Sequence, residues 1–342
     1  MIKKLSDLRG ISGFEYRLSD ELAALFGPYA DEVTFDSLGS MIAVRRSETK
    51  DAKKIMIEAH CDEIGLMVQD IDDRGFITFV NIGGVDPRVL PAAEVVVHGR
   101  RDLPGVIGAK PPHLMGEKEQ DKAAKLTDMA IDVGMPAQAV RSLVGVGDSI
   151  TLPQSVGRLA GTRFSGKTLD DRAGVAALLG VMQGLPRNLQ ADVYAVVAVQ
   201  EEVGCRGAKT AAYGILPDVA LVVDVCHGVT PDNSDNAFAI GSGTVISLGP
   251  NIHPYISRRL TALAKQYQIP YSIDVDGGNT GTDAWTIQVA RTGVATGLLS
   301  IPLRYMHTGV ETVDIADVEA TRDLISRFIA EFDTDLEGWL CY

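Results

Sequence analysis

The chain has 342 residues, with 32 basic and 45 acidic side chains and a formal net charge of −13. That length suggests two domains of ordinary size, and the acidic balance argues against a nucleic-acid partner, whose phosphates require excess Lys and Arg. No apolar run approaches the ~18 residues of a membrane span, and the four cysteines include no CxxC pair, so we expect a reduced, cytoplasmic protein that does not enter a membrane.

The first 30 residues have the leucine spacing of helices, interrupted by a turn at Gly10–Glu15. Strands are expected at Met41–Arg45 and Lys54–His60. From residue 67 to 165, short apolar stretches alternate with Gly, Pro and Asp, which is typical of a small β barrel or sandwich. A charged stretch within it, Glu117–Lys125, is expected to be a solvated loop.

After Lys167 the pattern becomes α/β. We expect helices at residues 173–184, 256–267, 282–291 and 315–332, and strands at 193–200, 219–224 and 294–301. The first two of these strands are apolar throughout, which is typical of a central sheet covered on both faces. The predicted organisation is a discontinuous α/β domain, residues 1–66 and 166–342, with the β domain of residues 67–165 inserted.

Polar clusters follow the predicted strands where these end. If the strands are parallel neighbours, the clusters meet at one edge of the sheet, where open α/β sheets bind ligands. Carboxylates gathered in this way are stable only when cations neutralise them. The residues concerned are His60 and Asp62, Asp170 and Asp171, Glu201 and Glu202, Asp224, and His307.

Imidazoles and carboxylates together are suitable ligands for two divalent ions of zinc, cobalt or manganese. Alternation along the strand puts Asp62 on the same side as His60, where it could hold the second ring nitrogen. One of the adjacent glutamates, Glu201 and Glu202, could bind metal while the other takes the proton of a water shared by the metals.

Each cluster also has an ordinary structural explanation. Asp170 and Asp171 could cap the helix that follows them, Glu201 and Glu202 could be a solvated helix start, and Asp224 could be a turn residue. Only their joint occurrence favours a metal site.

A competing motif is Gly161–Thr168, which has the GxxxxGK[ST] pattern of a phosphate-binding loop. It would make the chain a nucleotide-binding protein. Two features argue against that function: the preceding segment is a poor strand, and Asp170 and Asp171 would repel phosphates.

The chain resembles the tetrahedral (TET-type) aminopeptidases, dinuclear metallopeptidases also known as glutamyl aminopeptidases, deblocking aminopeptidases or endoglucanase homologues. The resemblance extends over nearly the whole chain, and its motifs occur in the order of the family: Gly10–Glu15, Ala59–Gly65, Leu169–Arg172, Gln200–Gly204, Val223–Asp224, Gly281–Asp283 and Tyr305–Thr308.

The resemblance implies that Asp170 bridges two metal ions, one also held by His60 and Asp224 and the other by Glu202 and His307. It implies that Glu201 is the general base and that Asp62 is the partner of His60. It further implies that the inserted domain is a β barrel that mediates dimer contacts, and that dimers assemble into a hollow homododecamer.

The predicted function is therefore removal of N-terminal residues from short peptides. A related metal-dependent deacylase, which would cleave a non-peptide amide, is the alternative within the same chemistry. His253, Thr282 and Asp283 are the candidates for lining the substrate pocket. The sequence leaves the preferred N-terminal residue and the metal undecided.

Overall fold

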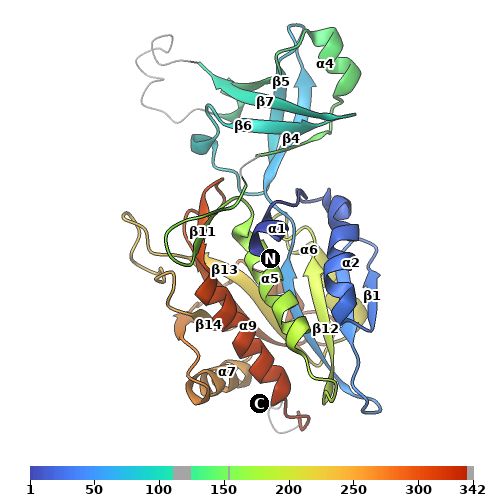
Figure 1. Cartoon of the computed structure of the whole chain (residues 1–342), viewed down its shortest axis with the longest axis vertical. Coiled ribbons are helices and arrows are strands. Elements are labelled where there is room, and N and C mark those ends of the chain that lie inside the picture. Colours follow the sequence, from blue (N-terminus) through green and yellow to red (C-terminus); the bar gives the residue numbers. More distant parts are fainter. Residues whose placement is uncertain (111–124, 153–154, 337–342) are drawn as a thin grey trace.

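The computed structural model describes residues 1–110, 125–152 and 155–336 (Figure 1). The stretch Glu117–Lys125, expected to be a loop, lies outside these residues except for Lys125. None of the helices in the described ranges is both long and apolar enough to cross a membrane.

An eight-stranded mixed sheet forms the centre of the larger part of the molecule (Figure 1). Its middle strands, β12, β3, β13 and β16, are parallel neighbours, while β2 and β14 flank them in antiparallel pairing. The strands in spatial order are β1 (Glu32–Phe35), β2 (Met41–Arg45), β12 (Ala191–Ala198), β3 (Lys53–His60), β13 (Val219–His227), β16 (Ala295–Leu303), β14 (Thr244–Leu248) and β15 (Tyr271–Val275).

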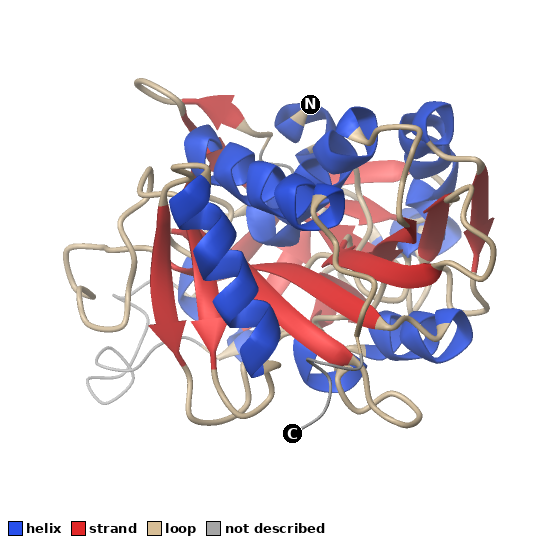
Figure 2. Cartoon of the chain, turned by 90° about the horizontal axis from the view of Figure 1, so that it is seen from below, coloured by secondary structure: helices blue, strands red, loops and turns tan. Residues whose placement is uncertain are grey.

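Helices cover both faces of this sheet (Figure 2), which confirms the predicted α/β class. On one face, α5 and α9 pack against each other and share the larger core with α1, α2 and α7. On the other face, α6 and α8 bury a smaller core. The helices are α1 (Ile2–Ser6), α2 (Ser19–Phe26), α5 (Leu169–Gly184), α6 (Arg206–Ile215), α7 (Pro254–Gln266), α8 (Ala284–Ile287) and α9 (Ile315–Ala330).

The burial of the middle strands explains their composition. Both faces of β13 and of the second half of β3 are buried, so successive residues are apolar instead of alternating with polar ones. Apart from the buried Glu58 of β3, polar residues return where these strands approach the carboxyl-terminal edge of the sheet, at His60 and Asp224.

Six strands between Gly65 and Thr151 close into a barrel with its own apolar core, as predicted for the inserted segment. In β7 buried and exposed residues alternate, because one side faces that core and the other faces solvent. The domain boundaries at 66 and 166 stay a prediction. The strands around the barrel are β4 (Gly65–Ile71), β5 (Ile77–Ile82), β8 (Met129–Asp132), β7 (Asp102–Ala109), β6 (Glu94–His98) and β9 (Ser149–Thr151), accompanied by α4 (Ala137–Leu143).

The structure contradicts the phosphate-loop interpretation of Gly161–Thr168. Within this stretch, β11 (Arg163–Gly166) is an extended strand that pairs with β10 (Gly157–Arg158) and β17 (Glu311–Asp314). Its backbone amides are therefore committed to a sheet, and the Lys167 ammonium group lies buried against Glu63. A loop that wraps a phosphate does not form.

The helix expected at residues 282–291 is shorter than predicted. Regular helix is confined to α8, and the chain then proceeds through turns to Gly293, where the positive φ of 101° favours glycine. Short 3₁₀ helices, which interrupt the N-terminal helical region and the barrel, complete the fold: η1 (Glu15–Leu18), η2 (Gly27–Tyr29), η3 (Pro87–Val89) and η5 (Leu126–Asp128).

Candidate metal centre

Five of the predicted residues lie together at the carboxyl-terminal edge of the central sheet and line one cavity. His60 ends β3, Asp224 lies near the end of β13, and His307 follows β16. Glu202 follows β12, and Asp170 comes from the distorted first turn of α5. Parallel pairing of the four strands is what brings their ends to the same place.

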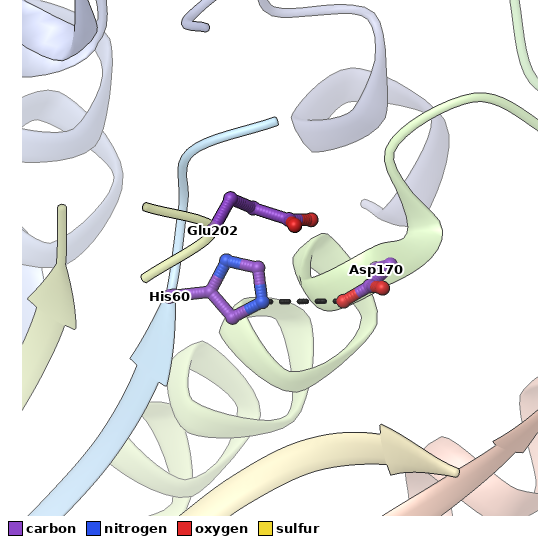
Figure 3. Close-up of side chains that lie close together, drawn as sticks. All are labelled: His60, Asp170 and Glu202. Atoms are coloured by element: carbon purple, nitrogen blue, oxygen red, sulfur yellow. Dashed lines mark hydrogen bonds and ion pairs between the residues drawn. The ribbon is translucent and has the colours of Figure 1, made fainter. Parts of the chain in front are cut away.

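The Asp170 carboxylate lies between two imidazole rings. Its Oδ1 is 3.2 Å from Nε2 of His60, and its Oδ2 is 3.4 Å from Nε2 of His307. Glu202 Oε2 lies 3.3 Å from the same His307 nitrogen. Figure 3 shows His60, Asp170 and Glu202 pointing toward a common centre from three different segments.

The opposite nitrogen of each ring has its own oxygen partner. His307 Nδ1 donates to the Gly84 carbonyl at 3.2 Å, and His60 Nδ1 lies 3.4 Å from Asp62 Oδ1. Since a carbonyl oxygen only accepts, the Nδ1 of His307 carries a proton, and in the neutral ring Nε2 presents a lone pair to the cluster. This is the usual arrangement of histidines that bind metal through Nε2.

The spacing of these atoms suits a metal. Ligand atoms 2.0–2.2 Å from a tetrahedral ion lie roughly 3.4 Å from one another. His60, Asp170 and Glu202 each offer one ligand atom within 4.8 Å of the others. Asp224 is buried and lines the same cavity, so its carboxylate is a fourth possible metal ligand beside these three residues.

The buried carboxylates of the cluster would be stabilised by a bound cation. Burial raises the pKa of Asp224 and of Glu202, and the neighbouring Asp170 raises both further. Hydrogen bonds to Asp170 and Glu202 raise the pKa of His307 to about 11. The pKa of His60 is also raised, because its interactions with Asp170 and Asp62 outweigh the effect of its burial. Thus protons on the rings compensate the acids where no metal does so.

The Asp62 carboxylate accepts hydrogen bonds from the backbone amides of both glutamates. Its Oδ1 accepts the Glu201 amide at 3.0 Å, its Oδ2 accepts the Glu202 amide at 3.2 Å, and Ser12 donates to the same carboxylate at 2.6 Å. The Glu201 side chain faces the cavity, and burial raises its pKa to about 8.

The three residues expected to line the substrate pocket lie in different places. Thr282 lines the cavity of the metal cluster, whose volume is about 630 Å³. Asp283 is buried close to Glu201 and Cys205 and does not itself line this cavity. His253 was wrongly placed: it caps α7 beside the amino-terminal end of β16 and lines a separate cavity of about 330 Å³.

The profile of the M42 glutamyl aminopeptidase family matches residues 39–324. The chain belongs to the M42 glutamyl aminopeptidase family. This confirms the resemblance derived from the motifs, and the chain is a hydrolase that acts on peptides.

Relatives of known structure or name support this assignment. The lysyl aminopeptidase of Pyrococcus furiosus is 36% identical over 97% of this chain and 96% of its own. Aminopeptidase APDkam598 of Desulfurococcus kamchatkensis is 38% identical, with a TM-score of 0.92 over 100% of this chain and 97% of its own. The TET1 peptidase of Pyrococcus horikoshii, which can assemble into a tetrahedron or a large octahedral shell, is 32% identical, with a TM-score of 0.85 over 97% of this chain and 98% of its own.

One buried carboxylate of this M42 site was not predicted. Glu311, the first residue of β17, accepts the amides of Leu169 at 2.7 Å and Asp170 at 3.1 Å through Oε2, and the amide of His307 at 2.9 Å through Oε1. It thereby ties two ligand-bearing segments together. A single glutamate four residues after a histidine carries no recognisable signal in the sequence.

Proposed function

We propose that this chain is a metal-dependent aminopeptidase that removes N-terminal residues from short peptides with two divalent metal ions of zinc, cobalt or manganese. The observation that carries the proposal is the Asp170 carboxylate, which presents one oxygen to each of two histidine Nε2 atoms. A carboxylate in that position is suited to bridge two ions.

In this proposal Asp170 would bind both ions, His60 and Asp224 would hold one of them, and Glu202 and His307 would hold the other. Bound ions would supply Lewis acidity, which lowers the pKa of a coordinated water and polarises the scissile carbonyl. The Gly84 carbonyl accepts a hydrogen bond from His307 Nδ1, and Asp62 Oδ1 lies 3.4 Å from His60 Nδ1, so each ring has an oxygen atom on the side away from the proposed metal-binding Nε2.

Glu201 is the proposed general base. It lines the cavity beside the ligands without belonging to them, and its backbone is fixed by Asp62. In the proposed cycle its carboxylate takes a proton from the attacking water and later gives that proton to the departing amine, which restores the carboxylate.

The test replaces Glu201 by Gln and measures metal content and turnover of aminoacyl anilides separately. We expect unchanged metal content and a loss of kcat of about 10²–10⁴-fold, the usual contribution of a general base. Glu319→Gln, an exposed glutamate on α9, is the matched control. Near-normal turnover of Glu201→Gln would remove this residue from the base role.

Comparing anilides that carry a free amino group with N-acylated anilides distinguishes the peptidase from the deacylase alternative. An aminopeptidase requires the free amine, so acylation should abolish hydrolysis. Preferential cleavage of the acylated compounds would instead favour the deacylase.

We also propose that the inserted barrel mediates dimer contacts and that the dimers form a homododecamer. The assembly of the TET1 relative supports this proposal. Light scattering after size exclusion should give twelve times the subunit mass of 36.5 kDa. A monomer at micromolar concentration would contradict it.

A further inference from the structure

We propose that the cavity selects substrates with a basic N-terminal residue, Lys or Arg, and that Asp274 and Asp276 determine this selectivity. The inference rests on the proposed aminopeptidase function, because it assigns the far end of the same cavity to the side chain of the residue that is removed.

The cavity extends from the metal cluster across the face of the sheet. Asp224 is paired with Ser300 of β16, and Ser247 of β14 is paired with Asp274 of β15, so the strands form a continuous floor. From β13 to β15 there are three strand spacings, or roughly 14 Å. Asp274 and Asp276 line the cavity at the β15 end of this floor.

Asp274 and Cys226 line the same cavity as the proposed metal ligand Asp224. Cys226 follows Asp224 by two residues on β13, so both belong to the same face of the strand and both line the cavity.

The far end of the cavity is acidic and has no neutralising cation. In the described ranges, neither Lys nor Arg lines the cavity, and neither Asp274 nor Asp276 forms an ion pair. The hydrogen bond found for Asp276 is from the Gly278 amide to Oδ1 at 2.9 Å. A basic side chain would supply the missing charge, whereas an acidic side chain would be repelled.

Polar groups on the floor also lack protein partners. Ser247 and Ser300 are 2% and 3% exposed and line the cavity, and neither hydroxyl has a hydrogen-bond partner among the residues described. Because both residues line the cavity, their hydroxyls are available to a ligand or to the water around it.

Apolar side chains also line the cavity: Phe238, Trp285, Leu298 and Met306. They suit the methylene stem of a long side chain, while its charged end reaches the carboxylates. A leucine could occupy the same cavity but would leave both carboxylates without a partner.

The test measures kcat/KM of the metal-loaded enzyme for Lys, Arg, Leu and Glu p-nitroanilides. For the wild type we expect Lys and Arg to exceed Leu by roughly 10- to 100-fold, the range of one hydrogen bond to a charged group, and Glu to be the poorest substrate. Asp274→Asn, Asp276→Asn and the double variant should lower the Lys-to-Leu ratio toward one.

Asp20→Asn, which alters an exposed aspartate on α2, should leave the ratio unchanged. Efficient cleavage of Leu or Glu anilides without a preference for Lys or Arg would overturn this inference while the aminopeptidase proposal stands. A preference for Lys that survives in the double variant would overturn the roles of Asp274 and Asp276. Failure to cleave any of the anilides would overturn the proposed function, and this inference with it.

Discussion

Glu311 connects the proposed ligands Asp170 and His307 through their backbone amides. Replacement by Gln keeps the size of the side chain but leaves one acceptor oxygen for three amides. We expect Glu311→Gln to lower metal affinity or turnover by roughly 10- to 100-fold, as is typical when a group that orients metal ligands is lost.

Isothermal titration with Zn²⁺ and Co²⁺ would measure the affinity of the Glu311→Gln variant, and kcat would be measured at saturating metal. The exposed variant Glu319→Gln is again the control. If metal affinity and turnover of Glu311→Gln both equal those of the wild type, Glu311 has no positioning role.

The thiols near the site are expected to be unreactive in the folded protein. Burial raises the pKa of Cys61 to about 12 and raises the pKa of Cys205 and Cys226 as well. At pH 8 roughly one Cys61 in 10⁴ would be a thiolate, the form that reacts. Peptide mass spectrometry after iodoacetamide treatment should find these three cysteines unmodified until urea is added, while N-acetylcysteine in the same tube is consumed. Rapid alkylation of Cys61 in the native protein would contradict this.

Residues that follow strands could be predicted, and those that act through distant contacts could not. His60 and Asp224 come at the ends of apolar runs, so the local sequence pattern predicts their positions at the edge of the sheet. Glu311 has no comparable local signal, because its role depends on contacts between segments that only the fold brings together.

At the scale of elements, Lys167, which lies in the short connection between β11 and α5, forms a buried ion pair. Lys167 Nζ pairs with Glu63 Oε2, and both side chains are less than 10% exposed. Lys167→Met would leave the Glu63 carboxylate buried without its cation, so we expect a loss of about 3–5 kcal/mol in the free energy of unfolding.

Urea denaturation measures this loss, and Lys4→Met provides a contrast. Lys4 pairs with Glu21 at the surface, where about half of each side chain is exposed, and its removal should cost less than ~1 kcal/mol. Equal effects of the two substitutions would contradict the structural role of Lys167. A rise in melting temperature with ATP would revive the phosphate-loop interpretation.

The elements with strong hydrophobic patterns were predicted, and those with weak patterns were missed. The buried strands β13 and β16 and the amphipathic helix α9 were expected at nearly their observed positions. In contrast, β15 is partly exposed along its whole length. The buried face of α6 has helical spacing, but it is formed mostly by small side chains: Ala208, Ala211, Ala212 and Ile215. Their places depend on the sheet to which they attach.

At the scale of the whole molecule, the barrel contributes to the proposed metal site. Gly84 lies between the barrel strands β5 and β6, and its carbonyl accepts from His307 Nδ1. A Cβ at this position would be 2.7 Å from that nitrogen. We therefore expect Gly84→Ala to displace the His307 ring and to lower turnover or metal affinity by roughly 10- to 100-fold.

The Gly84→Ala effect should appear in metal titration and kinetics, with little change in thermal unfolding. Gly145→Ala is the matched control, since a Cβ at that position would meet no atom within 4 Å and the φ of Gly145 is not positive. Unchanged metal affinity and turnover in Gly84→Ala would show that His307 does not depend on the barrel.

The strand order of the central sheet determines when it can be completed during synthesis. The neighbours of β3 are β12 and β13, so β3 leaves the ribosome more than a hundred residues before either of them. At about 5–20 residues per second, this strand waits roughly 7–26 seconds before its first neighbour, β12, is synthesised. The barrel is encoded entirely within that interval and can close first. Nascent chains halted after residue 152 should therefore bind holdase chaperones through β3, and release should follow only when translation has passed β13.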